Sequence, residues 1–289
     1  MAVATQSAPA PAARAGRRWG PSSLGGLAVW IMVGFFFVNL IGVIGTVVID
    51  SIGTTWFASW LPDGFTTHWY GDAWADFDLS NVLLVTAQIA FAVVAISIII
   101  GVPAAYALAR RNFPGKQLVS LLFLLPILIP PITYGIPLAT LLYKLQLAGN
   151  IQGVILANLV PTIPFVVLVM IPFIEQIDPK IESAARMCGA STLTIFVRVL
   201  GPLLLPGILA AGILVLVRTV GMFELTFLTS GPGSTTLIVV LYDAVFGAGI
   251  RAPQEVDAMA AIYTGSMLVL LVIALRFVNP TQLVTRVAD

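Results

Sequence analysis

Side chains that could perform catalysis or bind a metal are few in this sequence. It contains one histidine, His68, and one cysteine, Cys188. Because no second histidine accompanies His68, we expect it to be an ordinary surface residue. A single cysteine excludes an internal disulfide and a Cys-cluster metal site, so we expect Cys188 to be a small buried hydrophobic residue. Neither His-Glu-x-x-His nor the phosphate-binding Gly-x-x-x-x-Gly-Lys-Ser/Thr pattern occurs, and we therefore predict neither a hydrolase nor an ATPase.

Two charged residues, Arg218 and Glu224, interrupt the apolar stretch 207–231. Charges at membrane depth are costly and usually face a cavity or a partner. If both lie on one helix, their spacing separates them by about 120° around its axis, and a direct pair is not expected. Two interpretations stay open: each charge pairs with another helix or subunit or lies near an interface, or the charges contact a solute.

A third candidate region, residues 176–207, combines charged and small side chains. Its pattern predicts two short helices joined by a turn. Asp178 is a suitable N-cap for the first helix, and Ser191 can cap the second. Gly189 falls where the end of the first helix favours a left-handed residue.

The same region is predicted to form a rigid knob that docks into a groove of a partner. We expect Glu182 to be exposed on the first helix, where two neighbouring alanines would let another backbone approach closely. We expect the second helix to end at Gly201-Pro202 and the next membrane span to begin at Pro206.

The composition of the chain predicts an all-α, polytopic membrane protein. Of its 289 residues, 59% are hydrophobic and 9% are charged, whereas soluble domains carry about 25% charge. A membrane-crossing helix needs roughly 20 apolar residues. Buried helices of a large soluble protein would instead show polar faces at helical spacing. The uncharged intervals are 19–49, 79–109, 117–143, 145–174, 199–217 and 258–275, with 225–242 as a more mixed stretch.

The distribution of Lys and Arg predicts the orientation, because basic residues favour the cytoplasmic side. The segment 50–78 has five aspartates and no basic residue, whereas 110–116 has three basic residues. With six helices, only Lys144 and Arg251 fall on the outer side, and both termini are cytoplasmic. The six predicted crossings are 27–49, 80–109, 117–143, 152–174, 206–228 and 258–277.

These crossings divide the chain into four parts. The N-terminal segment is rich in Ala, Pro and Ser, which predicts a disordered tail. The apolar stretch after it is predicted to be an uncleaved first membrane helix rather than a signal peptide. The net charge of +1 gives no reason to expect a nucleic-acid partner. The predicted parts are a cytoplasmic tail 1–26, a first helix with an outer segment 27–78, a core domain 79–280 containing a cytoplasmic loop 176–206, and a cytoplasmic tail 281–289.

The cytoplasmic loop resembles that of permease subunits in binding-protein-dependent ABC importers. Their motif is Glu-Ala-Ala, three residues, Gly, and a later Pro. Ser183 and Gly201 depart from the pattern, but both are small. The resemblance covers roughly residues 79–280. The matching residues are Glu182, Ala184, Ala185, Gly189, Ala190, Ser191, Phe196, Pro202, Pro206 and Gly207.

The resemblance implies a multi-pass subunit with the six-helix, MetI-like fold of these permeases in a bacterial plasma (inner) membrane. Its implied partners are the lipid bilayer, two ATPase subunits that hold ATP and Mg, a second and distinct permease subunit, and an extracytoplasmic solute-binding protein. No cofactor is expected in this chain. It would couple to the ATPase through residues 178–207, with contacts from Glu182, Ser183, Ala184, Ala185, Arg186, Gly189, Ala190 and Ser191.

For the translocation pathway we expect Arg218, Glu224 and Tyr134, the last within a proline-rich stretch (126–137) that predicts a kinked helix. The segments 65–70 and 227–237 resemble permeases of the spermidine/putrescine group, which favours a polyamine-like solute. Sugar and sugar-alcohol permeases share the same loop and fold, and an arginine would suit an anion. An ion-coupled secondary transporter is a further alternative, but its internal repeat is not visible.

Overall fold

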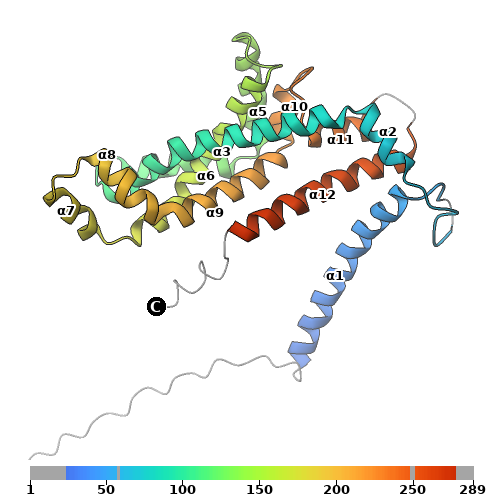
Figure 1. Cartoon of the computed structure of the whole chain (residues 1–289), viewed down its shortest axis with the longest axis horizontal. Helices are drawn as coiled ribbons and strands as arrows, with labels where there is room; N and C mark the ends of the chain where they lie inside the picture. Colours follow the sequence, from blue (N-terminus) through green and yellow to red (C-terminus); the bar gives the residue numbers. More distant parts are fainter. Residues whose placement is uncertain (1–23, 57–58, 248–250, 278–289) are drawn as a thin grey trace, which may run out of the picture. The chain divides into compact units, whose positions relative to one another are not determined.

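The computed structural model describes residues 24–56, 59–247 and 251–277 (Figure 1). Most of the predicted tail 1–26 and all of the tail 281–289 lie outside these ranges. Within them the chain is helical, and extended pairing is limited to one isolated bridge between Gly53 and Phe65. The first helices are α1 (Leu24–Ser51), α2 (His68–Asp76), α3 (Leu79–Arg110), α4 (Lys116–Leu128), α5 (Pro131–Lys144) and α6 (Ile151–Glu175). The later ones are α7 (Pro179–Met187), α8 (Thr192–Thr194), the π-helical η1 (Ile195–Leu200), α9 (Gly201–Val220), α10 (Glu224–Thr229), α11 (Leu237–Phe246) and α12 (Pro253–Phe277).

Among the described residues, five helical segments are long and apolar enough to cross a membrane: Gly26–Ser51, Leu79–Arg110, Ile151–Glu175, Thr192–Val220 and Pro253–Ile273. Helices α4 and α5 meet the same criterion together but are bent by 96°. If this pair is one broken crossing, the total is six. The predicted all-α membrane fold is therefore confirmed.

The described residues fall into two compact units, which divide between Val47 and Val48. The described part of the first unit belongs to α1, which carries large apolar side chains such as Trp30 and Phe35. A helix of this length and composition is suited to a lipid surrounding. The second unit contains the remaining helices and both candidate sites.

The crossing predicted at 117–143 is interrupted rather than continuous. Ile129 and Pro130 have extended backbone conformations, with ψ angles of 132° at both residues. Each of them precedes a proline, and the ring of a proline disfavours the helical conformation at the residue before it. The two consecutive prolines therefore break the helix, which the sequence predicted only as a kink.

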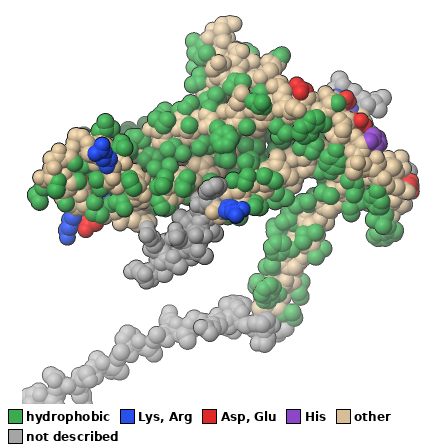
Figure 2. Space-filling view, in the orientation of Figure 1, with side chains coloured by type: hydrophobic (Ala, Val, Ile, Leu, Met, Phe, Trp, Pro, Cys, Tyr) green, Lys and Arg blue, Asp and Glu red, His purple; other side chains and the backbone are tan. Residues whose placement is uncertain are grey.

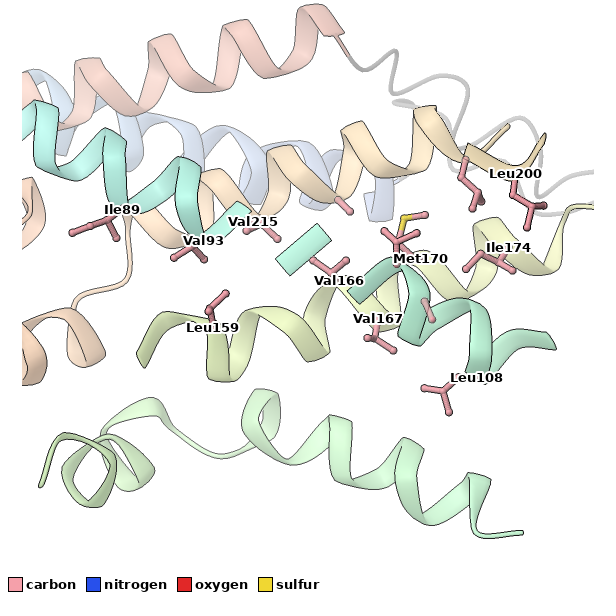
Figure 3. Close-up of a cluster of buried hydrophobic side chains, with 14 of the residues drawn as sticks. Ile89, Val93, Leu108, Leu159, Val166, Val167, Met170, Ile174, Leu200 and Val215 are labelled. Carbon is pink, nitrogen blue, oxygen red and sulfur yellow. The ribbon is translucent and has the colours of Figure 1, made fainter. Parts of the chain in front are cut away.

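The core of the second unit is formed where α3, α6 and α9 pack together. Figure 3 shows its side chains, among them Val93 of α3, Met170 of α6 and Val215 of α9, pointing toward one another. Small residues permit this close approach. A Cβ at Gly101 would lie 2.7 Å from Cγ1 of Val166, so α3 and α6 can approach as they do only with a glycine at this position.

The helix after the cytoplasmic loop differs from the prediction. It does not stop at Gly201-Pro202, because α8, η1 and α9 form one continuous run, Thr192–Val220. A proline in an α-helix clashes with the carbonyl four residues earlier. We attribute the continuity to the wider π-helical turn that immediately precedes Pro202. The crossing expected at 206–228 is thus replaced by one that begins earlier and ends at Val220.

Apolar side chains cover much of the long helices on the face shown in Figure 2. Basic and acidic side chains appear together near α7, and acidic side chains lie with the histidine near α2, at the opposite end of the second unit. Arg251 also lies at the α2 end, 3.7 Å from Asp76.

Candidate functional site

The first candidate site is the cytoplasmic loop, residues 176–206, called the coupling loop below. The Asp178 carboxylate caps α7 by accepting a hydrogen bond from the Lys180 N–H at 2.9 Å. Gly189 has φ +81°, in the left-handed region that favours glycine. The Ser191 hydroxyl caps the next helix by accepting from the Thr194 N–H at 3.2 Å. The predicted first helix, the turn at Gly189 and both caps are confirmed, whereas the second helix is not short, since it is the start of the continuous run Thr192–Val220.

The expected exposure of Glu182 is wrong. Its side chain is 7% exposed and points toward the end of α3. Tyr106 Oη donates to Glu182 Oε2 at 2.6 Å, and Arg110 Nε donates to Oε1 at 2.9 Å. A second nitrogen of Arg110, Nη2, donates to the Ile177 carbonyl. These three side chains, Glu182, Tyr106 and Arg110, are called the Glu182 clamp below.

In the Glu182 clamp, Arg110 and Tyr106 stabilise the negative charge of the Glu182 carboxylate, which would otherwise be costly to bury. Arg110 is itself only 13% exposed, whereas Arg186, 3.9 Å from the same carboxylate, is 58% exposed. Hydrogen bonds to charged groups contribute about 1.5–3 kcal/mol each. Removing one member of a buried ion pair costs about 3–5 kcal/mol, because the other charge is left without a partner. The strong interaction is therefore the one with Arg110.

The outer surface of the coupling loop carries most of the other predicted contact residues. Its two most exposed large apolar side chains, Met187 and Leu193, are 89% and 73% exposed. Cys188 is also exposed, contrary to the prediction, because it lies at the C-terminal cap of α7 on this outer surface. The exposed predicted residues are Ser183, Ala184, Arg186, Gly189 and Ser191, while Ala185 and Ala190 are half-buried against the core.

Sequence reasoning missed Tyr106 and Arg110, which lie 76 and 72 residues before Glu182. Nothing in the local pattern of α3 distinguishes them from the other residues near its end. The one available signal is that an arginine ends a long apolar helix, where it also favours the helix dipole. Met187 and Leu193 were visible as apolar residues in a polar loop, but their exposure was not predicted.

The second candidate site contains the three predicted pathway residues. Arg218 is on α9 and Glu224 begins α10, so the two are not on one helix and the angle expected between them does not apply. The helix ends at Val220, where a turn begins at Gly221. Tyr134, on α5, packs against the cluster that contains Met222 and Leu225. It therefore lies beside the start of α10, which begins at Glu224, but no hydrogen bond or ion pair within the described residues joins Tyr134, Arg218 and Glu224 to one another.

None of these three side chains is satisfied within the described part of the chain. The Tyr134 hydroxyl is buried and has no hydrogen-bond partner there. Arg218 and Glu224 are half-buried and form no ion pair with any described residue; the Arg218 guanidinium lies 5.3 Å from the centroid of the Phe165 ring. An unsatisfied buried polar group costs about 1–3 kcal/mol. This cost applies to the Tyr134 hydroxyl, whereas Arg218 and Glu224 are only half-buried.

Residues 97–282 match the family described as "binding-protein-dependent transport system inner membrane component". The sulfoquinovosyl glycerol transport system permease protein SmoH of Agrobacterium fabrum is 32% identical over 63% of this chain and 64% of its own length. The sulfate transport system permease protein CysW of Synechocystis is 29% identical over 62% of this chain and 73% of its own. The spermidine/putrescine transport system permease protein PotC of Haemophilus influenzae is 26% identical over 82% and 86%, respectively. The chain thus spans just under two thirds of the first of these relatives.

A solved structure has the same fold. It is a bacterial ABC transporter involved in the import of the acidic polysaccharide alginate, with a TM-score of 0.73 and 20% identity, covering 88% of this chain and 96% of the other. The family match extends over the coupling loop and the helices that carry both candidate sites. The chain therefore belongs to the family of inner-membrane components of binding-protein-dependent transport systems.

Proposed function

We propose that this chain forms part of the translocation pathway of an ATP-driven importer in a bacterial plasma membrane and receives movement from a separate ATPase through residues 178–207. The observation that carries this proposal is the coupling loop itself. It is capped at both helices and presents Arg186, Met187 and Leu193 to the outside. A stiff element with exposed apolar and basic side chains is suited to a groove on a partner.

The continuous helix Thr192–Val220 gives the coupling loop a direct mechanical connection to the membrane. A force applied at Leu193 acts on the first turns of the same helix that carries Arg218 in its last turn. ATP binding shifts such an equilibrium only if the ATPase contacts differ between two states of the permease. The coupling loop is the element through which we propose that this difference is transmitted.

The remaining partners follow from the family. We propose two ATPase subunits that carry ATP and Mg, a second and distinct permease subunit, and an extracytoplasmic solute-binding protein. One structural neighbour, at 17% identity and a TM-score of 0.57, is described as an alginate transporter in complex with a periplasmic protein. This chain contributes no hydrolytic chemistry in the proposal. Its core domain is residues 79–280.

We propose that Tyr134, Arg218 and Glu224 line the solute pathway. Glu224 has no cationic partner among the described residues, and this supports the polyamine-like solute that the sequence favours. A second candidate is a small oxyanion, because Arg218 also lacks an ion-pair partner in the described part of the chain. Relatives named for sulfate and for molybdenum transport are consistent with that alternative.

Cys188 provides a direct test of the coupling contact, because it is the only cysteine of the chain and is exposed on the coupling loop. We expect a thiol reagent to modify Cys188 at least about tenfold more slowly in the assembled complex than in the permease freed of its ATPase. A matched control is Gly71→Cys in a Cys188→Ser background. Gly71 is exposed on α2, and a Cβ there would meet nothing within 4 Å. Equal modification of Cys188 in both states would refute the contact.

The solute is tested by uptake into vesicles that contain the whole complex and its binding protein. For a polyamine, Glu224→Gln is expected to reduce putrescine uptake about tenfold or more, while Arg218→Gln reduces it less. If the vesicles instead take up sulfate or molybdate, and Arg218→Gln reduces this uptake more than Glu224→Gln does, the solute is an oxyanion. Glu175→Gln is the control, because Glu175 is an exposed acid at the end of α6.

A further inference from the structure

Glu182 connects two parts of the chain that the sequence places far apart. It lies on α7, whereas both of its strong hydrogen-bond partners, Tyr106 and Arg110, lie in the last two turns of α3. A cavity of about 380 Å³ lies beside these side chains, between the end of α3 and α7. The connection is thus made by long polar side chains reaching across a partly open space rather than by close packing of the two helices.

The members of the Glu182 clamp also hold the neighbouring segments. Arg110 donates to the carbonyl of Ile177, immediately before the capping residue Asp178, and so fixes the point where α7 begins. The Tyr106 ring packs edge-on against Phe196 of η1, with 5.7 Å between the ring centroids. The end of α3 therefore contacts the start of α7, its middle, and the helix that follows it.

We propose that Tyr106 and Arg110 are positioning residues that fasten the coupling loop to α3 through Glu182, so that movement of the loop is delivered to α3 as well as to the helix Thr192–Val220. This inference rests on the proposed contact between the coupling loop and the ATPase. It assigns Glu182 to the interior of the permease, whereas the sequence motif alone assigned it to the partner surface. Because α3 packs on both α6 and α9, the clamp gives the ATPase a second connection to the core.

The geometry argues against a direct contact of Glu182 with the ATPase. Both carboxylate oxygens already accept hydrogen bonds, and the side chain is 7% exposed. To reach a partner it would have to leave Arg110 buried without its counter-charge. Arg186 and Met187, on the exposed side of α7, reach the surface without any such loss.

The test uses the reconstituted complex with its ATPase and binding protein and measures solute molecules imported per ATP hydrolysed. We expect Arg110→Gln and Glu182→Gln each to lower this ratio about tenfold, because each removes a charged hydrogen bond. The double variant should be no worse than either single variant, since both remove the same interaction. The amount of ATPase retained and the protection of Cys188 should not change.

Arg111→Gln is the matched control: Arg111 is the next residue, is exposed, and its side chain has no hydrogen bond or ion pair within the described ranges. If Arg110→Gln does not reach the membrane, Tyr106→Phe, which removes only a hydroxyl group, is expected to lower the same ratio about threefold. The inference is overturned if Arg110→Gln and Tyr106→Phe import as many solute molecules per ATP as the wild type. It is also overturned if Glu182→Gln releases the ATPase while Arg110→Gln retains it. Failure of the proposed coupling contact gives a different result, an unprotected Cys188 in the wild-type complex.

Discussion

Gly189 allows the turn of the coupling loop to be tested without changing any contact within this chain. Its φ is +81°, and a Cβ at this position would meet nothing within 4 Å. Within the chain, a substitution here acts through the backbone, and because asparagine is larger than alanine, a milder effect of asparagine separates backbone strain from a steric clash with the ATPase. The left-handed conformation costs a non-glycine residue about 1–2 kcal/mol, which shifts the equilibrium of the turn about 5- to 30-fold. Asparagine tolerates this conformation better than alanine, and a β-branched residue tolerates it least.

We expect uptake per ATP to fall in the order Gly189→Asn, Gly189→Ala, Gly189→Val. The valine variant should lose about tenfold or more, while the amount of protein in the membrane stays close to that of the wild type. The assay is import into vesicles with ATP hydrolysis measured in parallel. Gly71→Val is the control, because Gly71 also has open space around a Cβ but does not have a positive φ. Wild-type coupling in Gly189→Val, or equal loss in Gly189→Asn, would refute the reasoning.

Three other substitutions test the packing and the caps. Gly101→Val should lower stability by about 1–3 kcal/mol, because a Cβ there would lie 2.7 Å from Cγ1 of Val166; an unchanged unfolding midpoint in detergent would contradict the packing of α3 on α6. Gly212→Ala should leave that midpoint nearly unchanged, since its Cβ would lie 3.2 Å from the flexible end of Ile98; a large drop would show that α9 is more tightly held than the structure indicates. Ser191→Ala should cost about 1 kcal/mol by removing a helix cap, and hydrogen exchange at residues 192–194 should increase, whereas unaltered exchange would exclude the capping role.

The membrane crossings were predictable because length and lack of charge are sufficient signals. The caps of α7 and α8 were predictable too, since Asp178 and Ser191 act on N–H groups two and three residues away. What these features share is that their physics is local. No knowledge of the tertiary structure is needed to see that a serine precedes a helix.

Two errors arose where tertiary contacts or unusual backbone geometry decide the outcome. Glu182 would be exposed if α7 were alone, and it is buried because its side chain contacts the end of α3. Pro202 appears to end a helix by the usual steric argument, but the π-helical turn before it keeps the run continuous. Neither the long-range ion pair nor the wider turn leaves a pattern in the neighbouring residues.

The pathway residues illustrate a third kind of error. Arg218 and Glu224 were identified from charge within an apolar stretch, and the structure places them on two different helices, α9 and α10. Their relative orientation could not be predicted, because it depends on the turn that begins at Gly221. A single turn between two helices changes the direction of every side chain that follows it.

The prolines of α4 and α5 also have a consequence for where water can lie. A proline has no N–H, so Pro126, Pro130 and Pro131 withhold the donors that would normally bond to the carbonyl groups of residues 122, 126 and 127. In hydrocarbon, bare peptide oxygens are not tolerated, and they must meet water or another polypeptide. The side of this helix pair that carries these oxygens therefore belongs against a hydrated interior or a neighbouring subunit, and only its leucine-rich side is suited to acyl chains.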